Sequence, residues 1–153
     1  MGAVEVRRTV PTPLGAVWDT LTDFGAYDRW IPLTSMRTDP PPVRLGWGFA
    51  GFTGLGPVGF LDSMLVVRWE PPVDGEARFA VRKTGRVLCG WAAVELTATD
   101  TGGTEVVWRE EIVPRPEPLG RLAAPASNRV TARLFAQALD RMLEAAAARS
   151  TST

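Results

Sequence analysis

Apolar and polar positions in the first thirty residues change from a strand period to a helix period. Residues Val4–Val10 nearly alternate between valine and charged or polar side chains, which is typical of a half-buried strand. Thr12 and Pro13 then offer a hydroxyl for a helix N-cap and a proline for the first helical position. Apolar residues recur at intervals of three and four residues as far as Leu21, so we expect a helix that ends near Asp23. A second short helical turn is predicted over residues 25–30.

From residue 36 to residue 114 the pattern changes to runs rich in Val, Phe, Trp and Thr, separated by clusters of Gly, Pro and Asp. This pattern predicts antiparallel strands joined by hairpins. We expect the strands near residues 35–39, 43–52, 59–70, 76–83, 86–99 and 104–113. Together with the first strand, they would make a sheet of about seven strands.

The last part of the chain, residues 127–148, contains neither Gly nor Pro and is rich in Ala, Leu and Arg, so one long helix is predicted. At helical spacing its charged residues gather on one side, which we expect to face solvent. The opposite side, expected to pack on the sheet, consists of Thr131, Leu134, Phe135, Ala138, Leu139 and Met142.

Composition narrows the class of protein. The chain has 153 residues, and we take residues 1–149 as one domain and residues 150–153 as a polar tail. Basic and acidic residues number 17 each, so net charge gives no reason to expect a nucleic-acid partner. No apolar run approaches the roughly 18 residues that cross a bilayer, and the first residues lack the apolar run of a signal peptide. The single cysteine allows no internal disulfide. We expect a cytoplasmic protein without stable membrane insertion, and the abundance of Arg, Ala, Pro and Gly is typical of a GC-rich bacterium.

Three segments resemble a known superfamily. They are VRRTVPTPLGAVWDTLTDF at residues 6–24, YDRW at residues 27–30 and VVRWEPP at residues 66–72. These segments, and the order of predicted elements, resemble the helix-grip (SRPBCC, START-like) superfamily, in particular small bacterial polyketide cyclase/dehydratase-like members. The resemblance implies an α+β helix-grip fold, in which a curved antiparallel sheet wraps a long C-terminal helix and two short helices follow the first strand. It implies a function less firmly, because this fold hosts carriers, cyclases and hydrolases alike.

A sheet gripped by a helix leaves a cavity, and this chain has many large apolar side chains that either line such a cavity or fill the core. For most single aromatic residues, core packing is the simpler interpretation. The candidate ligand-binding residues are Trp30, Trp47, Phe49, Phe52, Phe60, Met64, Phe79, Trp91, Trp108, Leu134, Phe135 and Ala138.

Glu110 is the candidate catalytic residue. Strand alternation places it on the same side as Trp108, facing inward, where a carboxylate is costly unless it is paired or kept for a site. Two interpretations stay open: a structurally paired or bulged residue, or an acid/base group with a raised pKa. Asp62 is a weaker polar candidate for the cavity, with a plain strand-end role as its alternative. Lys83 is expected to be a solvated strand end.

Several chemistries are excluded by residue types. The chain has no histidine, which removes His-based metal sites and Ser-His-Asp triads. Cys89 lies in an apolar run without an activating histidine and is expected to be inert. Residues 54–59 match the letters G-x-G-x-x-G, yet no helix follows and Pro57 removes an amide, so we expect a hairpin loop. No metal and no cofactor is predicted.

Two functions remain. One is a carrier or binding protein for an apolar or polyaromatic small molecule. The alternative is a polyketide cyclase/dehydratase-like enzyme that uses Glu110 as a pocket acid/base. The identity of the ligand and the oligomeric state do not follow from the sequence.

Overall fold

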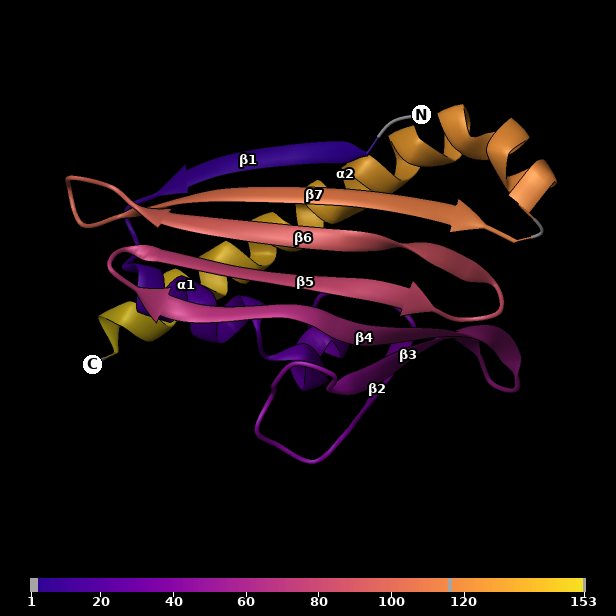
Figure 1. The fold of residues 1–153 in the computed structure, drawn as a ribbon, viewed down its shortest axis with the longest axis horizontal. Helices are drawn as coiled ribbons and strands as arrows, with labels where there is room; N and C mark the ends of the chain where they lie inside the picture. The colour runs from indigo at the N-terminus through magenta and orange to yellow at the C-terminus, as the bar shows by residue number, and fades with distance from the viewer. Residues whose placement is uncertain (1–2, 116, 153) are drawn as a thin grey trace.

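The computed structural model describes residues 3–115 and 117–152, without the side chains of residues 117–128 and 131 in the last helix. The elements run in the order that the sequence predicts, with a 3-10 helix, η1, as the second short helix (Figure 1). Their bounds are β1 (Val4–Val10), α1 (Leu14–Leu21), η1 (Phe24–Arg29), β2 (Thr34–Thr38), β3 (Gly48–Leu55), β4 (Val58–Val73), β5 (Glu76–Thr84), β6 (Leu88–Ala98), β7 (Thr104–Pro114) and α2 (Glu117–Thr151).

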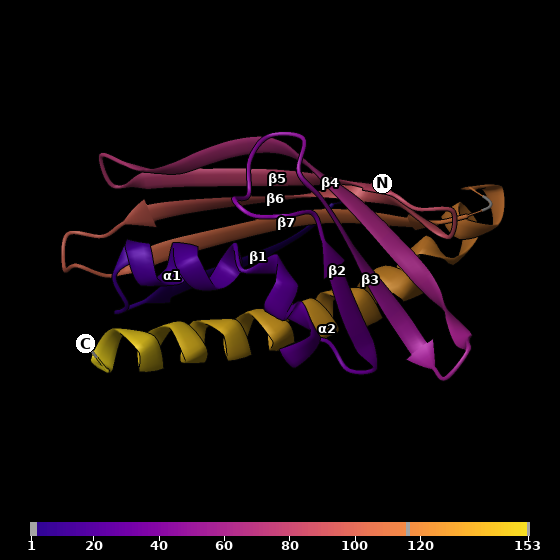
Figure 2. The ribbon, with the colours of Figure 1, turned by 90° about the horizontal axis from the view of Figure 1, so that it is seen from below.

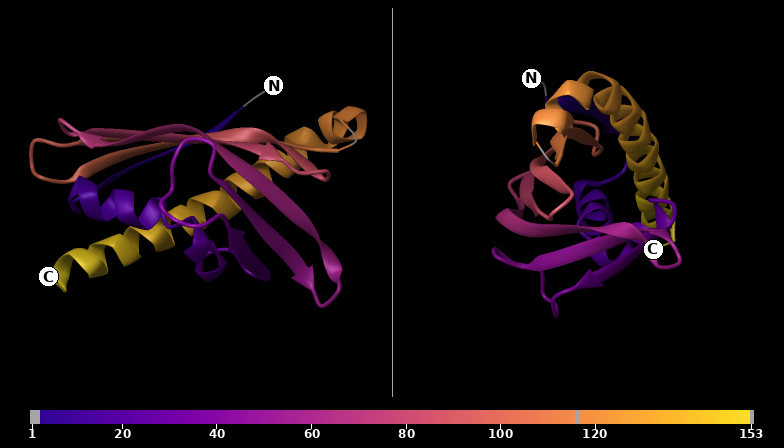
Figure 3. Two further views of the ribbon diagram at one scale, coloured as in Figure 1. Left: turned by 60° about the horizontal axis from the view of Figure 1, so that its bottom comes forward. Right: turned by 90° about the vertical axis from the view of Figure 1, so that its right-hand side faces the viewer.

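The strands of the described residues form one seven-stranded antiparallel sheet in the order β1-β7-β6-β5-β4-β3-β2. Figure 2 shows β2, β3 and the adjoining part of β4 turning away from the plane of β5, β6 and β7 on the side where α2 lies. The sheet is therefore curved, and α2 crosses its concave side diagonally (Figure 3). This arrangement confirms the α+β helix-grip fold.

Two strands differ in extent from the prediction. The strand expected from residue 43 begins only at Gly48, and β4 continues through Pro71 and Pro72 to Val73, where a turn was expected. The turn lies instead at Asp74 and Gly75, which have positive φ angles of 52° and 76°. A register shift between Glu70 and Val73 leaves the prolines without ladder partners in β5, which is how a strand tolerates residues that cannot donate.

Helix α1 follows Pro13 as predicted and buries Trp18 and Leu21 against the sheet. The expected hydroxyl cap from Thr12 is wrong. Pro13 is the N-cap residue and makes no side-chain capping bond. Thr12 is buried, and its carbonyl accepts a hydrogen bond of 2.8 Å from the Thr104 hydroxyl, which ties the segment before α1 to β7.

Helix α2 is longer than predicted at both ends. It begins at Glu117 instead of residue 127 and runs to Thr151, so the first two residues of the expected polar tail are helical. Gly120 and Pro125, which suggested that the helix starts later, lie inside it, because such residues weaken a helix without necessarily ending it. Within the described part of the chain, no helix is both long enough and apolar enough to span a membrane.

The two halves of α2 pack differently. Leu139, Met142, Leu143 and Ala146 are buried, and the helix as a whole contacts α1, β1 and β7. Leu134 is 57% exposed, so its expected burial on the sheet is wrong. The helix crosses the sheet diagonally, and its earlier turns do not follow the concave surface (Figure 3). Thr131, expected on the buried face, lies outside the described side chains.

An aromatic cluster fills the interior beneath α1 and η1. Phe24 stacks on Phe49 with ring centroids 4.4 Å apart, and it meets Phe79 edge-on at 5.4 Å. Trp18 contacts Phe79 and Trp69 in the same cluster. This end of the space between the sheet and α2 is therefore filled with packed core side chains.

Candidate functional site

An inner cavity of about 290 Å³ lies between the sheet and α2, beyond the part of this space that the two short helices fill. Its walls come from the inner face of the curved sheet, from the segment that joins η1 to β2, and from α2. The lining residues are Tyr27, Ile31, Thr34, Met36, Gly51, Thr53, Phe60, Asp62, Met64, Lys83, Leu88, Ile112, Pro114, Leu134 and Phe135.

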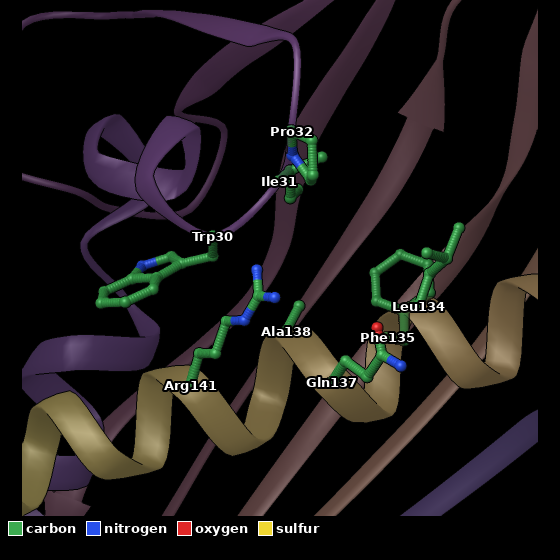
Figure 4. A pocket seen from close by; sticks show the side chains of 8 residues that line it. All are labelled: Trp30, Ile31, Pro32, Leu134, Phe135, Gln137, Ala138 and Arg141. Carbon is green, nitrogen blue, oxygen red and sulfur yellow. The ribbon is translucent and has the colours of Figure 1, made fainter.

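An outer cavity of about 180 Å³ lies between α2 and the segment after η1. It shares Ile31, Leu134 and Phe135 with the inner cavity, so the two adjoin. Figure 4 shows Trp30 and Ile31 facing Ala138 and Arg141 across this space. The remaining lining residues are Pro32 and Gln137.

The strands β2 and β3 contribute short and long side chains to the wall of the inner cavity. Thr34, Gly51 and Thr53 are short, whereas Met36 of β2 is long and also lines the cavity. The Met36 sulfur lies 3.3 Å from the place where a Cβ on Gly51 would stand, so this methionine covers the glycine. Gly51 pairs with Asp62 of β4, which brings that carboxylate to the same part of the wall.

A buried ion pair forms part of the cavity wall. The Lys83 ammonium lies 2.6 Å from Asp62 Oδ2 and 3.7 Å from Met64 Sδ, and only 7% of Lys83 is exposed. The expected solvated strand end is therefore wrong for Lys83. Alternation along β5 buries Phe79 and Val81, and Lys83 continues the same face. This alternation was the signal that could have identified Lys83 from the sequence.

The simpler interpretation of Asp62 as a strand-end residue is also wrong, because Asp62 lies inside β4, on the inner face of the strand. One carboxylate oxygen pairs with Lys83, whereas Oδ1 is buried without a hydrogen-bond partner among the described residues. A buried carboxylate oxygen that lost its water without gaining a donor carries a cost in free energy. The pair thus offers unused hydrogen-bonding capacity at the cavity.

Glu110 faces inward, as strand alternation predicts, and is 5% exposed. The Trp108 indole N–H donates to its Oε2 at 3.2 Å, while Oε1 is buried without a partner in the described part of the chain. Burial raises the pKa of Glu110 to about 7, and Asp62 adds to this rise, whereas Lys83 and the bond from Trp108 oppose it. Glu110 does not line either cavity, so it lies behind the wall.

Tyr27 is a cavity residue that sequence reasoning missed. Its hydroxyl donates a 2.5 Å hydrogen bond to the Leu21 carbonyl, which fixes η1 to the end of α1. Burial raises the pKa of Tyr27, and the charges of Asp23 and Glu110 act in the same direction. The hydroxyl is therefore neutral and already committed, and no feature of the local sequence distinguished it.

The predicted ligand-binding residues divide into three groups. Six of them line a cavity: Trp30, Phe60, Met64, Leu134, Phe135 and Ala138. Four are core residues instead: Trp47, Phe49, Phe79 and Trp108. Phe24 of η1 packs on the first three, whereas Trp108 contacts Phe79 and Phe135 of α2.

Phe52 and Trp91 lie outside both cavities and outside the core. Each follows an inner-face position by one residue, Gly51 or Gly90, so the pleat directs it to the opposite face, where it is half-buried. Their expected place in the cavity wall is corrected accordingly.

Other candidate chemistry has a structural role. Cys89 is half-buried, and its thiol donates to the Val113 carbonyl at 3.3 Å across the β6–β7 pair. Residues 54–59 form the hairpin between β3 and β4, as expected. The described residues contain no group of three or more His, Cys, Asp or Glu side chains suited to a metal ion.

Solved structures with the same fold share little sequence with this chain. A hypothetical protein from Helicobacter pylori has 15% identity and a TM-score of 0.77, with 95% of this chain and 88% of that one covered. An aromatase/cyclase from a Streptomyces species has 16% identity and a TM-score of 0.62, with 92% and 93% covered. Ara h 8.0201 has 12% identity and a TM-score of 0.59, with 94% and 98% covered. No curated protein matches this chain in sequence.

The fold and the cavity under α2 agree with a match at the level of the family. The family model described as polyketide cyclase/dehydrase and lipid transport matches residues 1–150, which is nearly the whole chain. The chain therefore belongs to the polyketide cyclase/dehydrase and lipid transport family.

Proposed function

We propose that this protein binds an apolar small molecule in the two adjoining cavities, as a carrier or binding protein. The observation that carries the proposal is the mostly apolar space that Leu134, Phe135 and Ala138, in the middle of α2, form with the sheet and with the segment after η1. A ligand there would cover Leu134, a large apolar side chain that is 57% exposed. Removing such apolar surface from water is the main source of affinity for an apolar ligand. The predicted cytoplasmic location and the absence of a nucleic-acid partner accompany this proposal and stay predictions.

The test uses Nile red, a neutral apolar dye, and two matched variants of α2. Leu134→Gln removes an apolar group from both cavities, whereas Val130→Gln makes the same kind of change at a position that is 60% exposed and lines neither cavity. We expect Leu134→Gln to weaken dye binding about tenfold, because it forfeits roughly 1.4 kcal/mol of apolar burial. Val130→Gln should bind as wild type does. Equal binding by all three proteins, or no binding by any, contradicts the proposal.

Native mass spectrometry of freshly purified protein provides a second test. A carrier with an occupied cavity should release a bound metabolite on mild activation, and Leu134→Gln should retain less of it than Val130→Gln.

An acid/base enzyme is the second candidate, and the raised pKa of Glu110, about 7, favours it. A cyclase/dehydratase-like reaction would need Glu110 to move a proton, yet this residue lies behind the cavity wall. With a poly-β-ketone probe, catalysis predicts that Glu110→Gln keeps binding and loses aromatic product. Binding alone predicts unchanged affinity and no turnover by either protein.

A further inference from the structure

The Asp62–Lys83 pair is placed where a ligand in the inner cavity would meet it. Both residues line that cavity, and their side chains are only 15% and 6% exposed. They come from adjacent strands, since Lys83 pairs in register with Met64, two residues after Asp62. The Thr34 and Thr53 hydroxyls also line this cavity, but they bond to each other at 2.8 Å. The Asp62–Lys83 pair is thus the charged spot of the wall, at a fixed position.

The hydrogen bonds of the Asp62–Lys83 pair leave some of its donors and acceptors unused. Asp62 Oδ1 is a buried acceptor without a donor among the described residues. The Lys83 ammonium has three N–H groups, of which one bonds to Asp62 Oδ2 and one makes a long contact with Met64 Sδ. The contacts described leave one N–H of Lys83 available. One donor and one acceptor are therefore needed to complete the pair.

Charge limits the chemistry of that missing group. The titratable side chains that act on one another here are Asp62, Lys83, Glu110 and Tyr27, and the Tyr27 hydroxyl is neutral. Their summed charge is zero when Glu110 is protonated and negative when it is ionised, so the spot has no surplus positive charge. A ligand carboxylate supplies no donor for Asp62 Oδ1 and is repelled by two acidic side chains. A hydroxyl donates and accepts at once.

We propose that Asp62 and Lys83 form a polar subsite that selects ligands with a hydroxyl group on an apolar body over carboxylates and over purely apolar molecules. The proposal rests on the proposed binding function and names the chemical class of its ligand. The ligand hydroxyl donates to Asp62 Oδ1 and accepts from Lys83 Nζ. The apolar body extends past Met64 and Phe60 towards Leu134.

Three probes of similar shape test this selection: 2-methylnaphthalene, 2-naphthol and 2-naphthoate, titrated by protein-observed NMR at pH 7. We expect 2-naphthol to bind about tenfold more tightly than 2-methylnaphthalene, the factor that one net hydrogen bond contributes. The carboxylate should bind more weakly than both. If 2-methylnaphthalene equals 2-naphthol, or if 2-naphthoate binds best, the subsite proposal is overturned while apolar binding stands. If no probe binds, the proposed function fails as well.

A double variant assigns the preference to the pair without leaving one buried charge alone. Asp62→Leu combined with Lys83→Met replaces both partners by apolar groups, a change that folded proteins often tolerate. It should keep the affinity for 2-methylnaphthalene within about threefold and lose the preference for 2-naphthol. The matched control replaces the exposed pair of the same strand, Arg68→Met with Glu70→Leu, and should keep the preference. A preference that survives in the first variant contradicts the proposal.

Discussion

The space between the sheet and α2 has two ends that share the same sheet and the same helix. One end is filled with core side chains and is called the solid end, and the other contains the two cavities and is called the hollow end. At the solid end, α1 and η1 place Trp18 and Phe24 between the sheet and α2, and the second half of α2 packs on them. At the hollow end η1 contributes Tyr27 to the cavity wall, and the inner face of β2 and β3 presents Met36, Gly51 and Thr53. The comparison indicates that the short helices decide where the fold is core and where it can hold a ligand.

The largest expected effect separates the two halves of α2 by one kind of substitution. Leu139 is 2% exposed at the solid end, and Leu134 is 57% exposed at the hollow end. Leu139→Ala should lower the free energy of unfolding by about 3 kcal/mol, because it leaves a void in packed surroundings. Leu134→Ala should change it by less than about 0.5 kcal/mol. Urea denaturation of both variants measures the difference, and equal losses would mean that the ends do not differ in packing.

The order of elements, the seven strands and the helix-grip fold could be predicted because they depend on periodicity and on turn residues, which are local. The distinction between core and cavity could not. Trp47 and Phe60 have the same apolar character in the sequence, yet η1 covers the first and leaves the second beside empty space. Which aromatic residue meets an inserted helix depends on the diagonal path of α2 and on the curvature of the sheet.

The polar part of the site shows a different limit. The inward direction of Glu110 followed from alternation along β7, and it is confirmed. The same argument applied to β5 would have placed Lys83 inside, but a lysine beside Arg82 and a turn is usually solvated. The partner that makes its burial acceptable, Asp62, is 21 residues away in sequence. Such a pair is visible only once the register between β4 and β5 is known.

The second prediction concerns Glu110, which lies between the aromatic core and the polar subsite. The unfolded chain ionises this group near its usual value of 4.5, whereas the folded protein does so near 7. The folded state therefore binds the proton more tightly, and stability from this group is lost as pH rises through 7. Between pH 5 and pH 8 the wild type should lose about 2 to 3 kcal/mol relative to Glu110→Gln, which cannot titrate.

Urea denaturation of both proteins at the two pH values measures this difference, and other titrating groups cancel in the comparison. Glu110→Gln should be the more stable protein at pH 8 and close to wild type at pH 5. A difference that stays constant with pH would mean that the Glu110 carboxyl keeps an ordinary pKa, and its candidacy as an acid/base group would then lapse.

The smallest expected effect tests whether ion pairs help to hold the solid end together. Arg8 of β1 lies 2.8 Å from Asp140 of α2, but both side chains are more than a third exposed. Solvent and salt screen such a pair, so Asp140→Asn should lower the free energy of unfolding by no more than about 0.5 kcal/mol. A double-mutant cycle with Arg8→Gln in low and high salt isolates the pair. A coupling above about 1.5 kcal/mol that persists in high salt would show that charge, and not only apolar burial around Leu139, fixes α2 to the sheet.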